Sequence, residues 1–159
     1  MIAFTKMELA ERWRSGCIVS CQALEDEPLH GSHLMAAMAR AAELGGAAGI
    51  RANSPADIAA IKAAVSIPVI GLYKAAYPGF EVLITPTLDE AREVARAGAD
   101  ALAIDATFNA RPHGETFEGI VNTLRAEYPD LAVFADVSTL EEGVRAMDAG
   151  ADFVSTAIA

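Results

Sequence analysis

Short apolar runs alternate along the chain with stretches in which apolar residues recur at helical spacing. The runs are continuously apolar, as is typical of strands buried on both faces of a parallel sheet. Helical spacing relates Ile58, Ile61 and Val65 in one stretch and Phe117 to Leu124 in another. This alternation predicts an α/β fold with seven strands, at Ile18–Gln22, Ala48–Arg51, Pro68–Lys74, Val82–Thr85, Ala101–Asp105, Leu131–Asp136 and Phe153–Thr156.

Helix starts and an internal repeat support the alternation. A hydroxyl residue followed three positions later by an acid is a typical helix cap. Such pairs begin at Ser54, Thr87 and Ser138. Thr87–Glu90 also matches Thr139–Glu142 at an offset of 52 residues. Two units of strand and helix, each about 26 residues long, account for this period.

Strands and helices alternate in this way in two folds, the doubly wound open sheet and the (β/α)₈ barrel. The polar residues at the strand ends distinguish between them. Gln22, Arg51, Lys74, Asp105 and Asp136 each stand at the C-terminal end of a different predicted strand. An open sheet gathers its polar groups at one switch point, whereas a barrel collects them from many strands around one mouth. We therefore predict a (β/α)₈ TIM barrel. It is incomplete, because seven strands fall short of the eight that closure needs.

The composition fits one domain. Residues 1–159 are 53% hydrophobic and 21% charged, which is enough apolar material for a core without disulfides or metals. We therefore expect a single barrel domain that lacks its C-terminal units. The formal net charge of −10 argues against a nucleic-acid or anionic-membrane surface, because both need a basic patch. A small anionic substrate is compatible with this charge, because one or two arginines in a cleft act locally.

The two cysteines predict a reducing compartment. Cys17 and Cys21 lie in one apolar run, and in an extended strand residues four apart are about 13 Å from each other. A disulfide requires Cα atoms within about 7 Å, so the two thiols cannot pair. Residues 1–6 show no secretory signal, and no apolar run approaches the roughly 20 residues of a membrane span. We expect a cytoplasmic protein with reduced thiols.

Lys74 and Gln22 are candidates for chemistry and substrate contact. A partly desolvated lysine at a barrel mouth can act as an acid or base, or form an imine with a carbonyl substrate. The alternative for Lys74 is a lysine that marks the end of the strand with its charge in water. The amide of Gln22 suits a hydrogen bond to a sugar hydroxyl.

Three charged residues need partners if they are buried at the mouth. The guanidinium of Arg51 suits a carboxylate, a phosphate or a sugar oxygen. The alternative for Arg51 is a structural ion pair with Asp105 or Glu25. Asp105 and Asp136 end apolar runs, where a buried carboxylate is costly unless it is paired.

The sequence predicts neither a metal site nor a dinucleotide site. His30, His33 and His113 have no ligand spacing with a third partner. Gly45 and Gly46 close a helix, whereas a dinucleotide fingerprint opens one after a strand.

At these residues the chain closely resembles the N-acylglucosamine-6-phosphate 2-epimerases, also called N-acetylmannosamine-6-phosphate 2-epimerases. The matching stretches span nearly the whole chain in the order of the family. They are Ile18 to His30, Gly49–Ala52, Pro68–Gly71 with Lys74, Ile84–Thr87, Ile104–Thr107, Arg111–Pro112 and Ala135–Glu142. Within the first stretch, Val19-Ser-Cys-Gln22 is highly specific.

The resemblance implies a barrel of the phosphate-binding type and a cofactor-independent isomerase of sialic-acid catabolism. Such an enzyme interconverts N-acetylmannosamine 6-phosphate and N-acetylglucosamine 6-phosphate by removing and returning the C2 proton. Lys74 matches the catalytic lysine of the family. Gln22, Arg51 and Asp136 match positions that contact the sugar, and Asp105 matches a carboxylate at the mouth. The resemblance also implies a homodimer, because members of the family are often dimers.

The sequence departs from the family in three places, one of which is His113 in the loop Arg111–Glu115. After the lysine the family carries a basic and then a polar or acidic residue, where this chain has Ala75 and Ala76. The Gly-Tyr-Thr, Ala-Glu-Gly and Ile-Thr-Arg-Pro segments of the family, which hold a glutamate and the phosphate site, are absent from these 159 residues. We therefore expect little or no epimerase activity, with the first and last strands as unpaired edges. The alternatives are a non-catalytic barrel fragment and another sugar-phosphate lyase or isomerase that uses a lysine imine.

Overall fold

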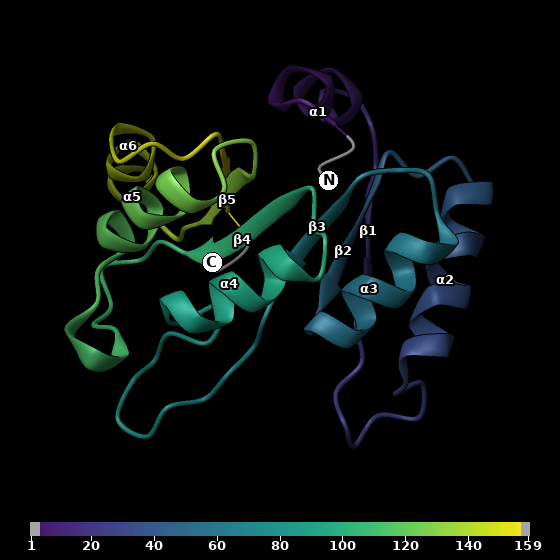
Figure 1. The fold of residues 1–159 in the computed structure, drawn as a ribbon, viewed down its shortest axis with the longest axis horizontal. Coiled ribbons are helices and arrows are strands. Elements are labelled where there is room, and N and C mark those ends of the chain that lie inside the picture. Colours follow the sequence, from purple (N-terminus) through teal and green to yellow (C-terminus); the bar gives the residue numbers. More distant parts are fainter. Residues whose placement is uncertain (1–3, 157–159) are drawn as a thin grey trace.

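The computed structural model describes residues 4–156, in which six strands alternate with helices (Figure 1). The strands are β1 (Ile18–Cys21), β2 (Gly49–Asn53), β3 (Val69–Leu72), β4 (Ala101–Asp105), β5 (Ala132–Asp136) and β6 (Phe153–Ser155). The helices are α1 (Lys6–Trp13), α2 (Ser32–Leu44), α3 (Pro55–Ala64), α4 (Leu88–Arg96), α5 (Phe117–Glu127), α6 (Leu140–Asp148) and the short 3-10 helix η1 (Pro112–Gly114).

The strands form one parallel sheet in chain order, from β1 to β6. The continuous burial predicted for a parallel sheet is confirmed at its centre, where every residue of β3 and β4 is buried. Helices α2 to α6 cover the outer face over a large apolar cluster, to which Met35, Ile61, Leu102 and Leu124 belong. The predicted α/β architecture is confirmed as a half-barrel of six parallel strands.

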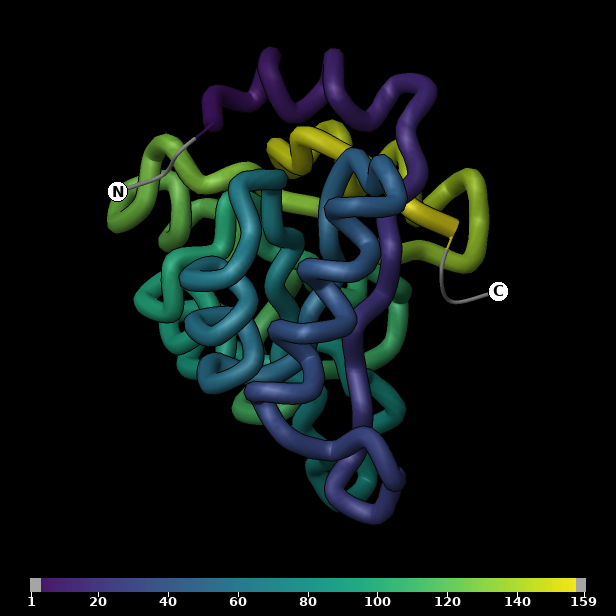
Figure 2. The backbone as a smooth tube through the Cα atoms, turned by 90° about the vertical axis from the view of Figure 1, so that its right-hand side faces the viewer, coloured from purple at the N-terminus to yellow at the C-terminus, as the bar shows by residue number. Residues whose placement is uncertain are grey.

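A second apolar cluster fills the inner face of the sheet, and α1 covers it where the strands begin. Leu9 of α1 is fully buried in the same cluster as Ile70. The indole of Trp13 packs edge-on against Phe134 and Phe153, with ring centroids 5.9 and 5.1 Å away. Figure 2 shows α1 lying across one end of the molecule. The opposite end, where the strands finish, is formed by loops and polar residues.

The prediction of seven strands is wrong at Val82–Thr85, which forms no strand of the sheet. Ile84 instead pairs antiparallel with Lys74 in an isolated bridge. The Asp105 amide donates to the Ile84 carbonyl at 3.0 Å, so the segment joins the end of β4 to the residues after β3. So short a run does not distinguish a strand from a loop, which is why its pattern predicts a strand incorrectly. In the loop that it forms, Val82 and Thr85 are buried and Leu83 is 43% exposed.

The helix caps follow the sequence closely. Thr87 caps α4 and Ser54 caps α3, as predicted. At α6 the cap lies one residue beyond the predicted Ser138. The hydroxyl of Thr139 accepts from the Glu142 amide, and the Glu142 carboxylate reaches back to the Thr139 amide. This reciprocal arrangement is the one that the repeat of Thr139–Glu142 implies.

The two thiols are free, as predicted. Cys21 is buried, and burial raises its pKa, whereas Cys17 is exposed. Among residues 4–156 no helix is both long enough and apolar enough to cross a membrane.

Candidate functional site

Polar side chains gather at the end of the sheet where the strands finish. Asp105, Asp136 and Ser155 are aligned in register on β4, β5 and β6. Asp105 and Asp136 are the last residues of their strands, as predicted. Arg51 is two residues from the end of its strand, because β2 continues to Asn53.

The other two predicted site residues lie just beyond their strands. Gln22 directly follows β1, and Lys74 comes two residues after the end of β3. Both side chains are half-buried. The predicted strand Pro68–Lys74 is therefore too long at its end, and Lys74 belongs to the loop that leaves the mouth.

Arg51 and Asp136 form a two-pronged ion pair. Nη1 of Arg51 donates to Oδ1 of Asp136 at 3.1 Å, and Nη2 donates to Oδ2. Strands β3 and β4 separate β2 from β5, a distance of roughly 14 Å along the sheet at the usual strand spacing. The two side chains meet because the sheet curls and both project from its concave face. This contact places the predicted residues of two distant strands in one site.

The ion pair between Arg51 and Asp136 is buried, so its formation costs hydration free energy and depends on each group having this partner. The Asp136 side chain is fully buried, and that of Arg51 is 13% exposed. Burial raises the pKa of the Asp136 carboxyl, the Arg51 guanidinium opposes the rise, and the nearby Asp105 adds to it. The sequence alternative named Asp105 or Glu25 as a structural partner of Arg51, and the structure corrects that partner to Asp136.

Asp105 is held by its own loop. Its Oδ1 atom accepts hydrogen bonds from the Thr107 amide at 2.9 Å and the Thr107 hydroxyl at 2.7 Å. This local turn supplies the partner that a buried carboxylate requires. Asp105 therefore lies beside the ion pair as a carboxylate whose orientation is fixed.

The backbone at Lys74 is fixed from two sides. The Lys74 amide donates to Oδ1 of Asn53, at the end of β2, with a distance of 2.8 Å. On the other side, the Tyr73 amide donates to Oγ1 of Thr85 at 3.2 Å, and the Thr85 amide donates to the Tyr73 carbonyl at 2.8 Å. None of the ion pairs among residues 4–156 includes the Lys74 ammonium group. The chain therefore anchors the backbone of this lysine and leaves its side chain available.

Arg111 anchors the segment that supports Lys74. Its Nη1 atom donates to the carbonyls of Thr85 and Pro86, at 3.2 and 3.0 Å. Thr85 has a φ of 49°, which is uncommon for a residue with a side chain, and it is fully buried. Burial lowers the pKa of Arg111, and the negative charge of Asp105 opposes this. The buried guanidinium of Arg111 therefore stabilises the strained turn at Thr85, which in turn supports the backbone before the predicted catalytic lysine.

The loop after β4 is anchored to α6. The Glu142 carboxylate accepts from the amides of Phe108 and Ser138, each at 2.9 Å. Burial opposes ionisation of Glu142, but these bonds, with those from Thr139 and the Ser138 hydroxyl, lower its pKa to about 2. Arg145 donates to the carbonyl of Thr107 at 3.0 Å. These contacts fix the loop that carries the partner of Asp105.

Sequence reasoning missed three residues that shape the site: Asn53, Thr85 and Arg111. Asn53 is a polar residue at the end of β2, so its position at a strand end could have identified it from the sequence as a site residue. Arg111 lies in a stretch that carries the family resemblance, but its contact with Thr85 depends on the fold. Within residues 4–156 there is also no group of three or more His, Cys, Asp or Glu residues that could hold a metal ion.

Comparison with known proteins identifies the family. A family model described as "Putative N-acetylmannosamine-6-phosphate epimerase" matches residues 35–159. The chain belongs to this family. The resemblance found in the sequence is thereby confirmed.

Individual members of the epimerase family are similar over nearly the whole chain. A relative from Caldanaerobacter subterraneus subsp. tengcongensis, described as "Putative N-acetylmannosamine-6-phosphate 2-epimerase", is 50% identical over 153 residues. The match covers 96% of this chain and 65% of the relative. The solved structure of the N-acetylmannosamine-6-phosphate 2-epimerase from Clostridium perfringens is 45% identical, with a TM-score of 0.85. That match covers 89% of this chain and 61% of the Clostridium chain.

The chain spans less than two thirds of the length of the epimerase-family relatives it matches. More distant barrels share the fold alone. A thiamine phosphate pyrophosphorylase from Pyrococcus furiosus, for example, is 18% identical with a TM-score of 0.53, over 91% of this chain and 61% of its own.

Proposed function

We propose that this chain forms the lysine-bearing part of an epimerase site that interconverts N-acetylmannosamine 6-phosphate and N-acetylglucosamine 6-phosphate. The observation that carries the proposal is the ion pair between Arg51 and Asp136 at the mouth of a family barrel. It fixes a cation at the same end of the sheet as an anchored lysine whose side chain is available.

Lys74 is the group we assign to the proton transfer. The C2 carbon of the ring-opened sugar lies next to the C1 aldehyde, so removal of its proton gives an enolate. An amine can accept this proton, and the resulting ammonium inverts C2 when it returns the proton to the opposite face of the planar enolate. The anchors at Asn53 and Thr85 support this role, because general acid–base catalysis depends on a fixed distance between the base and the proton.

Arg51 is the group we assign to the negative charge of the enolate. A guanidinium in a mostly buried site stabilises an oxyanion more strongly than it would in water. Asp136 orients Arg51 through the two hydrogen bonds between them. Gln22 and Asp105 complete the proposal as hydrogen-bonding partners of the sugar. This set of residues requires no cofactor for the proposed step.

Of all parts of the substrate, the phosphate group has the fewest candidate binding residues among the described residues. In TIM barrels phosphate binds to the loops after the seventh and eighth strands. Residues 4–156 contain six strands. We therefore propose that residues 1–159, as a single barrel domain without its last units, epimerise slowly or not at all when alone. We also propose a cytoplasmic location, because both thiols are free.

A proton NMR assay in D₂O tests the proposal. The 159-residue chain is supplied with N-acetylmannosamine 6-phosphate, alone and fused to the part of the Clostridium perfringens relative that it does not match. We expect C2 exchange and the gluco epimer from the fusion, and loss of both in Lys74→Ala. Lys6→Ala, on α1, is the matched control and retains activity.

Two results would contradict the assignment. Near wild-type exchange in the folded Lys74→Ala fusion would exclude Lys74 as the proton carrier. Covalent trapping of a sugar phosphate on Lys74 by borohydride would indicate an imine mechanism, since the enolate route forms no adduct. The homodimer that the resemblance implies stays a prediction, which sedimentation of the fusion measures.

A further inference from the structure

Two glutamates that match each other in the internal repeat each bind two separate parts of the chain. Glu90 closes the capping box of α4, and Glu142 closes that of α6. In both residues Oε2 accepts the hydrogen bonds that cap the helix. In both residues Oε1 accepts a hydrogen bond from a loop at the mouth, donated by Tyr77 in one case and by Phe108 in the other.

Glu90 holds the loop that follows Lys74. The hydroxyl of Tyr77, three residues after the lysine, donates to Oε1 of Glu90 at 2.6 Å. This bond is the main reason why the pKa of Tyr77 is raised. Burial opposes ionisation of Glu90, but bonds from Thr87 and Tyr77 lower its pKa. A neutral hydroxyl therefore donates to a charged carboxylate, which gives a stronger hydrogen bond than two neutral groups do.

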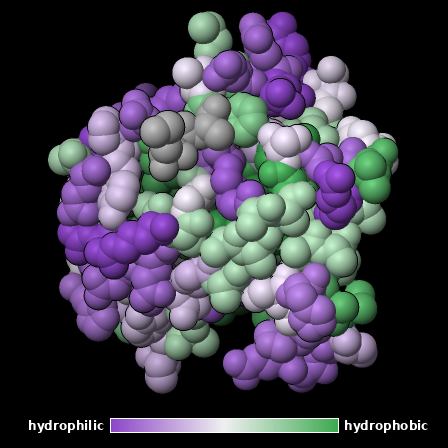
Figure 3. All heavy atoms as spheres, turned by 45° about the vertical axis from the view of Figure 1, so that its right-hand side comes forward, coloured by the Kyte–Doolittle hydropathy of each residue, from purple (hydrophilic) through white to green (hydrophobic). Residues whose placement is uncertain are grey.

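The loop of residues 75–82 is open to solvent at its tip, where residues 78–81 are exposed. In Figure 3 hydrophilic side chains are prominent at the lower end of the molecule, toward which the loops of the mouth extend in Figure 1. At the base of the loop the Ala75 amide donates to the Leu83 carbonyl at 3.1 Å. Between base and tip, the hydroxyl of Tyr77 ties the loop to α4. Loss of this hydroxyl therefore frees the middle of the loop while its base stays bonded.

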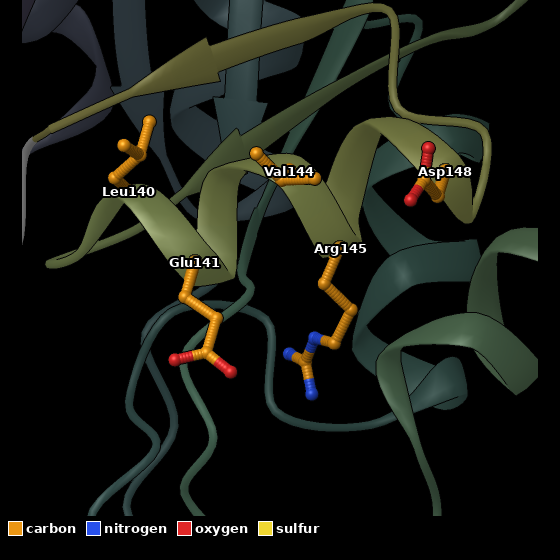
Figure 4. A pocket seen from close by; sticks show the side chains of 5 residues that line it. All are labelled: Leu140, Glu141, Val144, Arg145 and Asp148. Atoms are coloured by element: carbon orange, nitrogen blue, oxygen red, sulfur yellow. The ribbon is translucent and has the colours of Figure 1, made fainter.

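Glu142 holds the loop that follows Asp105 in the same way. Its Oε1 atom accepts from the Phe108 amide at 2.9 Å. Arg145, which extends from α6 one turn after Glu142 (Figure 4), donates to the Ala106 carbonyl at 2.7 Å. Its guanidinium carbon lies 4.5 Å from the ring centroid of Phe108. The start of α6 therefore fixes this loop as the start of α4 fixes the loop of the lysine.

Capping alone does not require the second set of contacts. In the capping box of α1, at the opposite end of the sheet, Glu8 accepts hydrogen bonds from Thr5 alone among residues 4–156. Glu8 is exposed, whereas Glu90 and Glu142 are buried. A buried carboxylate is costly unless its oxygens have partners, and the mouth loops supply them. The repeat therefore serves the loops of the mouth as well as the helix starts.

We propose that Glu90 and Glu142 are positioning residues for the site, each of which ties the loop of one site residue to the start of a helix. Glu90 acts on Lys74 through Tyr77, and Glu142 acts on Asp105 through the loop at Phe108. The inference rests on the proposed function, because it takes Lys74 as the proton carrier. Proton transfer depends on the distance between the base and the proton, so the effect is on kcat rather than on KM.

Tyr77→Phe tests the lysine loop, because it removes the hydroxyl and keeps the ring and the cap of α4. In the 159-residue chain we expect the amides of Lys74 and Ala75 to exchange with solvent about ten-fold faster, as measured by NMR. In the fusion with the Clostridium perfringens part, kcat should fall about ten-fold while KM changes by less than about two-fold. Tyr128→Phe, the same change at the end of α5, is the matched control and leaves both measurements unchanged.

Glu90→Gln and Glu142→Gln test the pair, because glutamine still caps a helix but has one carboxylate oxygen fewer. Glu90→Gln should speed exchange at Lys74 and not at Phe108, and Glu142→Gln should do the reverse. Unchanged exchange at Lys74 in Tyr77→Phe would overturn the inference, as would faster exchange with wild-type kcat. An active Lys74→Ala fusion would instead contradict the proposed function, and the exchange rates would still decide whether each glutamate fixes its loop.

Discussion

Arg51 and Asp136 are 85 residues apart in the chain and three strands apart in the sheet, yet they share two hydrogen bonds. The contact exists because the sheet curls, and it links the two halves of the half-barrel at the mouth. A charged pair at this depth is a costly way to stabilise a fold, because both groups lose hydration. Its position at the same end of the sheet as the anchored Lys74 fits a role in the site.

The first prediction concerns this pair. Arg51→Met and Asp136→Leu should each lower the free energy of unfolding by about 3 kcal/mol, because each leaves a buried charge without its partner. The double variant should regain most of this loss, because it removes both charges. Urea unfolding of the three variants measures the effect. Additive losses in the double variant would show that the two side chains are not coupled.

The second prediction concerns pH. The pKa of Glu142 is lowered to about 2 in the folded chain, from an ordinary value of 4.5. A lowered folded pKa contributes stability that is complete above the unfolded pKa and is lost as pH falls toward 2. The contribution is about 3 kcal/mol for a shift of this size. Urea unfolding between pH 6 and pH 2 measures it.

Glu142→Gln should flatten this dependence on pH, while Glu141→Gln should leave it unchanged. Glu141 is the matched control, because it precedes Glu142 on α6 and its side chain is exposed. Parallel pH profiles for wild type and Glu142→Gln would assign the acid sensitivity to other carboxylates.

The third prediction concerns the support beneath Lys74. Arg111→Met removes the donor to the Thr85 and Pro86 carbonyls, so the turn should open more often. We expect the amides of Lys74 and Thr85 to exchange with solvent about ten-fold faster, which corresponds to about 1.4 kcal/mol. Hydrogen exchange followed by NMR provides the measurement. Arg96→Met, at an exposed position on α4, is the control; a similar increase there would show that the effect is not local.

The fourth prediction concerns the packing of the strand before Lys74. A Cβ atom at Gly71 would lie 2.7 Å from atoms of Ile58 and Val94 and 2.8 Å from Ala99. Gly71→Ala should therefore destabilise the fold by about 2 kcal/mol through overpacking. At Gly45 the nearest atoms are 3.4 Å away, so Gly45→Ala should be close to neutral. Thermal unfolding compares the two, and equal stability would mean that α3 and α4 can move away from β3.

The sequence by itself determined the strand and helix alternation, most helix caps, the family and the residues at the strand ends. These features are local, because burial on both faces gives continuous apolar runs and caps need only neighbouring residues. Asp105 and Asp136 could be placed at the mouth for this reason. The run Val82–Thr85 could not be placed, because so short a run fits a strand and a partly buried loop equally.

Only the tertiary structure decided which side chains meet. The partner of Arg51 depends on how far the sheet curls, and curvature is the sum of many strand pairings rather than a property of any short segment. The same holds for Asn53 and Arg111, which support Lys74 through contacts between distant elements.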